Sequence, residues 1–185
     1  MKITFELTDS DLDFFREALV RASGSATDLA QEHIIDNARG LLGKVWRSDT
    51  SDFIRERMRQ LETIIGMVED ASWALEDDDR ARALRALSYF SEPEDLIPDD
   101  LPGLGFLDDA IMIEIVSLEL EHELHAYRDF CAYRTTEISR HGEEVLILER
   151  SDWLEERRQQ LHSRMRRRRR RDQAGSRGRS AFSLF

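Results

Sequence analysis

All three prolines of the 185-residue chain fall within ten residues, at Pro93, Pro98 and Pro102. Proline fixes its own φ, lacks a backbone N–H and pushes the preceding residue towards an extended conformation. A regular helix is therefore excluded from about residue 91 to residue 105. Because no proline occurs elsewhere and the chain has only nine glycines, the sequence predicts long helices on both sides of one irregular loop.

Apolar residues recur at helical spacing on both sides of this loop. They predict helices from Thr8 to about Gly24, from Thr27 or Asp28 to about Trp46, from Ser51 or Asp52 through Val68, from Asp77 through Phe90, from Asp108 to about Glu137, and from Ser151 or Asp152 onward. Thr8 and Asp11 have the spacing of a capping box at the first start. The helix after the loop is apolar on so many sides that we expect it at the centre of a bundle.

Residues 3–7 alternate apolar and polar side chains, and residues 144–149 contain a short apolar run; both patterns are typical of β-strands. Pairing the two segments would give hydrogen-bond partners to the backbone N–H and C=O groups of both. The predicted fold class is therefore mainly α. We expect a small helical bundle built on a helix–proline-rich loop–helix core, with a two-stranded ribbon between the ends and a basic C-terminal tail.

The formal net charge of −11 is distributed very unevenly. Residues 155–185 hold eleven arginines against three carboxylates, whereas residues 1–154 hold 16 basic and 35 acidic side chains. This division predicts an acidic helical body over 1–154 and an Arg-rich helical extension with a flexible tail over 155–185.

The single cysteine, Cys131, excludes an internal disulfide and favours a reducing compartment. It has no evident histidine partner, so we expect a small packed side chain. No stretch reaches the 18–20 or so uncharged apolar residues that a spanning helix needs, and no signal-peptide layout opens the chain. We therefore expect a cytoplasmic protein that is not transmembrane.

The segment around the prolines contains the pattern P-x-D-L-I-P-D-x-x-P-x-x-G-x-x-D-D. Its fixed positions are Pro93, Asp95, Leu96, Ile97, Pro98, Asp99, Pro102, Gly105, Asp108 and Asp109. Over about 84–123 the chain resembles the YkvA-like family, a domain of unknown function. The resemblance implies a helix–loop–helix core and no established activity. Membrane-associated relatives imply peripheral membrane association, although Glu94 and Asp100 place charges where that family is more often apolar.

The acids of this loop admit two interpretations. In the architectural one, Asp95 and Asp99 hold the turn, Asp108 and Asp109 favour the dipole of the following helix, and Gly105 permits positive φ or close packing. In the other, Asp95, Asp99, Asp108 and Asp109 converge on Mg²⁺ or Ca²⁺, which prefer oxygen ligands. That alternative would make the protein a divalent-metal-dependent enzyme, and no other cofactor is predicted.

Glu119 and His122 form the Glu-x-x-His half-motif of ferritin-like di-iron bundles. The chain has no second such pair, and His122 with His125 has no neighbouring third ligand for zinc. We therefore expect these side chains to be solvated or paired with arginine, and no catalytic residue is predicted.

The densest positive charge lies near the C-terminus, at Arg164, Arg166, Arg167, Arg168, Arg169, Arg170 and Arg171. Guanidinium groups bind phosphate bidentately, which predicts RNA, DNA or an anionic membrane surface as the partner. If this segment neutralised six to ten phosphates, its affinity would fall roughly 10³–10⁵-fold as the salt concentration rises from 50 to 200 mM. Phe182, Leu184 and Phe185 would favour the membrane. The third interpretation is a solvated tail, or one that folds against the acidic body within one chain or, by self-association, between two chains. The predicted function is a non-enzymatic adaptor or binding module.

Overall fold

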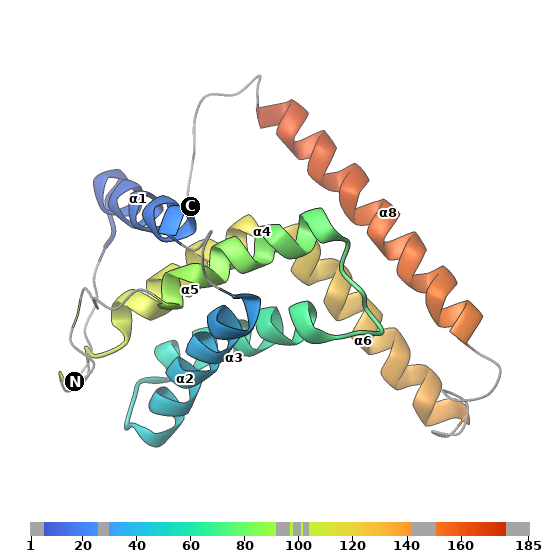
Figure 1. Cartoon of the computed structure of the whole chain (residues 1–185), viewed down its shortest axis with the longest axis horizontal. Helices are drawn as coiled ribbons and strands as arrows, with labels where there is room; N and C mark the ends of the chain where they lie inside the picture. Colours follow the sequence, from blue (N-terminus) through green and yellow to red (C-terminus); the bar gives the residue numbers. More distant parts are fainter. Residues whose placement is uncertain are drawn as a thin grey trace. The chain divides into compact units, whose positions relative to one another are not determined.

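The computed structural model describes residues 6–25, 30–91, 97, 101, 104–141 and 151–176 (Figure 1). Their regular structure is seven α-helices and one 3₁₀ helix. In chain order these are α1 (Asp9–Ser25), α2 (Gln31–Arg47), α3 (Asp52–Glu69), α4 (Asp77–Leu87), η2 (Ser88–Ser91), α5 (Leu107–Glu119), α6 (Glu121–His141) and α8 (Ser151–Ser176). The mainly α prediction is confirmed. Residues 6 and 7 are not in a strand, and the rest of the predicted ribbon, 3–5 and 144–149, lies outside the described residues.

The chain forms two compact units. The first consists of Met1–Glu69 and Ala74–Glu119, and the second of Asp70–Trp73 and Leu120–Phe185. These two units are defined by which residues contact one another. The predicted boundary between residues 154 and 155 is defined by the distribution of charge, and it stays a prediction. The second unit is discontinuous, because its first four residues come from the connection between α3 and α4.

The first unit buries one face of each of its longer helices. α3 packs against α2 and α5, while α1 packs against α4 and η2. Met58, Leu61 and Ile64 of α3 and Met112 and Ile113 of α5 are fully buried. Burying a side chain of this size is worth roughly 1.5–3 kcal/mol. α5 is apolar nearly all round, as the sequence predicts for a central helix.

The start of α1 has the predicted capping box. The Thr8 backbone N–H donates to Asp11 Oδ2 at 2.8 Å, and the Asp11 N–H donates to Thr8 Oγ1 at 3.4 Å. These bonds satisfy backbone donors that the first helical turn would otherwise leave open. The backbone hydrogen bond from Thr8 lowers the pKa of the Asp11 carboxyl below its ordinary value.

The predicted continuous helix from Asp108 to about Glu137 is wrong in one respect. It is broken at Leu120, where α5 ends and α6 begins one residue later. The Arg82 side chain of α4 donates a hydrogen bond to the backbone oxygen of Glu119. This contact gives a partner to one of the carbonyls that a helix end leaves unsatisfied, and its donor is 37 residues away in sequence.

The main elements of the second unit are α6 and α8, which pack against each other as an antiparallel pair (Figure 1). Trp73 is 0 % exposed although it lies in the turn between α3 and α4. Its ring stacks on His162 of α8 with centroids 4.2 Å apart, and it contacts Tyr127 and Phe130 of α6. His162 Nε2 also donates to the Trp73 carbonyl oxygen at 3.1 Å.

Asp70 fixes the turn that carries Trp73. Its Oδ1 accepts the backbone N–H groups of Ser72 and Trp73 at 2.9 and 3.2 Å. Its Oδ2 accepts the Tyr127 hydroxyl at 3.2 Å and lies 2.8 Å from Arg134 Nη1. Burial, with smaller contributions from Cys131 and Asp70, raises the pKa of the Tyr127 hydroxyl well above its ordinary value. The phenol therefore stays protonated and donates to Asp70 at neutral pH.

Candidate functional site

The structure describes three of the site residues predicted in the proline-rich loop. These are Gly105, Asp108 and Asp109. Pro93, Asp95, Pro98, Asp99 and Pro102 lie outside the described residues, so their predicted roles stay predictions.

Asp108 joins the loop to the first turn of α5. It is 2 % exposed, and its Oδ2 accepts the backbone N–H of Ile97 at 3.0 Å. Asp109 is also buried, and both acids lie where a helix N-terminus favours negative charge. The contact with Ile97 is of the kind that the architectural interpretation requires.

The backbone just before α5 is tightly turned. The N–H of Gly105 donates to the carbonyl oxygen of Leu101 at 2.8 Å, and Gly105 is buried. The next residue, Phe106, has a φ of 66°, which is rare for a bulky side chain. Phe106 is buried, and its carbonyl oxygen accepts the N–H of Ala110 at 3.0 Å. Apolar burial and this first helical bond offset the cost of its backbone conformation.

Asp108→Ala should lower the free energy of unfolding by about 1–3 kcal/mol, because it leaves the N–H of Ile97 without its acceptor. Asp108→Asn keeps an acceptor oxygen and should cost less. Urea denaturation followed by far-UV circular dichroism measures both. Asp13→Ala, at an exposed position of α1, is the control and should stay within about 0.5 kcal/mol of the wild type. A loss for Asp108→Ala no larger than for Asp13→Ala would contradict the anchoring role.

No three His, Cys, Asp or Glu side chains come close enough to share a metal ion within the part of the chain that the structure describes. The cation interpretation for Asp95, Asp99, Asp108 and Asp109 has two of its four carboxylates outside that part. It predicts that Mg²⁺ or Ca²⁺ raises the Tm of the wild type and that Asp108→Asn abolishes the rise.

Glu119 and His122 do not share a helix. The break at Leu120 puts Glu119 at the end of α5 and His122 in α6, so the two residues do not lie on one continuous helix, as the half-motif of a di-iron bundle requires. His122 Nε2 instead lies 3.3 Å from Asp172 Oδ2 of α8. The sequence predicts that these side chains are solvated or paired with arginine. Glu119 is exposed, whereas His122 lies beside an acid and, among the described residues, pairs with no arginine.

The predicted arginines occupy both sides of α8. Arg164, Arg167, Arg170 and Arg171 are exposed, whereas Arg166, Arg168 and Arg169 are half-buried. We call the four exposed residues the arginine face. At 100° per residue they lie within one 120° sector of the helix, whose centre is about 160° from Met165 and about 120° from Leu161. Among the described residues Arg164, Arg167 and Arg170 make no ion pair, and the 3.3 Å contact of Arg171 with Asp172 is between exposed groups.

The other side of α8 holds the helix on α6. Leu161 and Met165 are buried, and Arg169 Nη1 donates to Glu123 Oε1 at 2.7 Å. Glu123 is 0 % exposed, and sequence reasoning did not single it out. Its position beside Leu124, three residues after Leu120 and four before Tyr127, places it on the apolar side of α6. That spacing was the signal that could have identified it.

The described helices include none with the length and apolarity needed to cross a membrane. The exposed positions of α8 between 156 and 173 carry no apolar side chain. An interfacial helix buries an apolar face in the headgroup region, and the described part of α8 directs its apolar residues inward.

Comparison with known proteins places one family on the chain. Residues 79–115, from α4 to the middle of α5, match the family described as "Protein of unknown function (DUF1232)". A domain of unknown function at this place is thus confirmed, while the more specific assignment to the YkvA-like family stays a prediction. No curated protein and no solved structure matches the chain.

Proposed function

We propose that this protein is a non-enzymatic binding module whose arginine face binds the phosphate backbone of nucleic acid. The observation that supports it is the group of four exposed guanidinium groups on one side of a helix whose other side is fixed to α6. A positioned guanidinium loses less side-chain freedom on binding than one on a disordered segment. Each can donate two parallel hydrogen bonds to a phosphate.

The spacing of these groups suits a nucleic acid. Seven residues separate Arg164 from Arg171, which is about 10 Å along a helix. A duplex rises about 3.4 Å per phosphate on each strand, so this length spans about three base-pair steps. Phosphate contacts of this kind carry no sequence information. We therefore expect binding that does not depend on base sequence.

Nucleic acid is favoured over an anionic membrane because the exposed side of α8 is entirely polar between 156 and 173. Polybasic membrane segments bind stably when a second, apolar signal accompanies the charge. Phe182, Leu184 and Phe185, which could supply such a signal, lie outside the described residues. The test must therefore distinguish binding to nucleic acid from binding to an anionic membrane.

The wild type should bind a mixed-sequence DNA duplex or RNA with a steep salt dependence. With four phosphates neutralised, the slope of log K against log salt is about −3.6 on duplex DNA and about −2.8 on a single strand, and affinity for the duplex falls roughly 100-fold between 50 and 200 mM salt. The variant Arg164→Gln/Arg167→Gln/Arg170→Gln should reduce the slope to about −0.9, because each lost phosphate contact removes about 0.9. Fluorescence anisotropy of labelled duplex and single-stranded RNA measures both quantities.

The matched control is Arg59→Gln/Arg128→Gln/Arg140→Gln. It removes three exposed arginines from α3 and α6 and changes the net charge equally, so it should leave the slope nearly unchanged. Equal effects of the two triple variants would contradict a defined face. Binding only to phosphatidylserine vesicles, with none to nucleic acid at 50 mM salt, would replace this proposal with the membrane one.

A further inference from the structure

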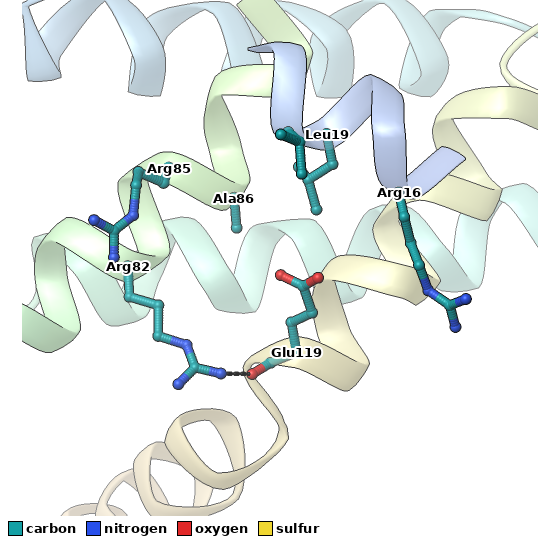
Figure 2. A pocket seen from close by; sticks show the side chains of 7 residues that line it. Arg16, Leu19, Arg82, Arg85, Ala86 and Glu119 are labelled. Atoms are coloured by element: carbon teal, nitrogen blue, oxygen red, sulfur yellow. Dashed lines mark hydrogen bonds between the residues drawn. The ribbon is translucent and has the colours of Figure 1, made fainter. Parts of the chain in front are cut away.

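The first unit contains a cavity of about 650 Å³ between α1, α4 and the C-terminal end of α5 (Figure 2). Its volume lies within the roughly 300–1,000 Å³ typical of small-molecule sites. The α4 wall belongs to the stretch that matches the family of unknown function. The cavity shares no residue with the arginine face, so a ligand bound in it is independent of the proposed function.

One carboxylate projects into this cavity. Figure 2 shows the Glu119 side chain turned towards Leu19 of α1 and Ala86 of α4. Glu119 is exposed, and its carboxylate makes no ion pair with any residue that the structure describes. Its backbone oxygen, by contrast, is occupied by Arg82. The carboxylate is therefore available to a positive group from outside.

Three arginines line the same cavity, namely Arg16 of α1 and Arg82 and Arg85 of α4. Figure 2 places the two α4 arginines on one side of the Glu119 carboxylate and Arg16 on the other. Arg16 Nη1 lies 2.9 Å from Asp13 Oδ1, and the side chains of Arg16 and Asp13 are 42 % and 70 % exposed. Exposed pairs of this kind are weak, so Arg16 can exchange Asp13 for a ligand acid.

The charged side chains of the lining are thus three arginines and one glutamate, and its apolar side chains are aliphatic. Leu19 and Ala86 are buried, whereas the Val20 side chain is 71 % exposed at the cavity wall. A ligand with aliphatic carbons would cover part of Val20, which is a favourable change. A simple anion would meet repulsion from Glu119, and a simple cation would meet it from three arginines.

We infer that this cavity binds a small zwitterion with one ammonium group and two acidic groups, carboxylate or phosphate, joined by a short aliphatic chain. The ammonium group pairs with Glu119, and the acidic groups accept hydrogen bonds from the arginines on the two sides. The aliphatic carbons lie on Leu19, Val20 and Ala86.

Isothermal titration calorimetry of the full chain tests this with L-glutamate and O-phosphoserine, which differ in the second acidic group. Glutarate lacks the ammonium group, and butylamine lacks the acids. At least one zwitterion should bind at millimolar concentration or below, about tenfold or more tightly than glutarate or butylamine. Methyl NMR shifts at Leu19 and Val20 should locate it in the cavity.

The decisive variant is Glu119→Gln, which keeps the backbone oxygen that Arg82 uses and removes only the negative charge. It should weaken binding of the zwitterion about tenfold and strengthen binding of glutarate. Arg85→Gln should weaken both. Glu17→Gln, at an exposed α1 position outside the cavity, is the matched control and should change neither.

The inference would be overturned if the wild type bound neither zwitterion at a ligand concentration of about 10 mM, which is well above the expected Kd of about 1 mM or below. Glutarate binding as tightly as L-glutamate would overturn it equally, as would equal effects of Glu119→Gln and Glu17→Gln.

Discussion

Trp73→Ala should lower the free energy of unfolding of the second unit by about 3–5 kcal/mol, the range found when a large buried aromatic side chain is truncated. The indole is fully buried and contacts both helices of the unit, through Phe130 on α6 and His162 on α8. The centroid of the Trp73 ring lies 5.1 Å from that of Phe130 and 4.2 Å from that of His162, so truncation to alanine removes both contacts. Urea denaturation followed by far-UV circular dichroism measures the change.

Trp73→Phe should cost much less than Trp73→Ala. Phenylalanine keeps most of the aromatic contact, and the indole N–H that it removes has no hydrogen-bond acceptor among the described residues. Trp46→Ala is the control of equal chemistry, because Trp46 is only half-buried and its Nε1 donates to the exposed acid Glu62. If Trp73→Ala destabilised the chain no more than Trp46→Ala, Trp73 could not be the centre of this unit.

Arg169→Leu should lower the free energy of unfolding by about 3 kcal/mol, because it removes a cationic partner from a carboxylate that cannot reach water. Glu123 is 0 % exposed and Arg169 donates to it at 2.7 Å. Glu123→Gln should cost less, since the Arg169 side chain is 20 % exposed and its guanidinium can turn to solvent. The order of the two losses therefore tests which partner is trapped.

Arg170→Leu is the matched control for Arg169→Leu. The two residues are neighbours in α8, yet Arg170 is exposed and makes no ion pair with the described residues. Its replacement should change stability by no more than about 0.5 kcal/mol. Equal losses from the two leucine variants would show that position along α8, and not the buried pair, determines stability.

Local patterns predicted most of the helices because they depend on residues close together in sequence. The capping box at Thr8 and Asp11, the start of α8 at Ser151 and the apolar character of α5 are all of this kind. The break at Leu120 is different, because no proline or glycine stands beside it in the sequence and the side chain that bonds the end of α5, Arg82, comes from another helix. The burial of Trp73 in a turn likewise depends on helices that come much later in the chain.

The candidate surface was only partly predictable for a related reason. The run from Arg166 to Arg171 suggests one uniform basic segment, but a helix distributes its members around the axis. Met165 lies four residues before Arg169, and this spacing turns Arg169 towards α6. Which acid would meet Arg169 could not be inferred, since Glu123 is 46 residues away.

The origin of Asp70–Trp73 between α3 and α4 has a consequence for how the nascent chain matures. Trp73 leaves the ribosome long before Tyr127, Phe130 and His162, which cover it in the finished unit. Until α8 has been synthesised, the Trp73 ring lacks His162, which stacks on it in the finished unit, and that side of the ring is open to capture by chaperones. A chain truncated before residue 155 keeps Tyr127 and Phe130 but never gains His162. Such a truncation would therefore remove one side of the Trp73 packing together with the arginines.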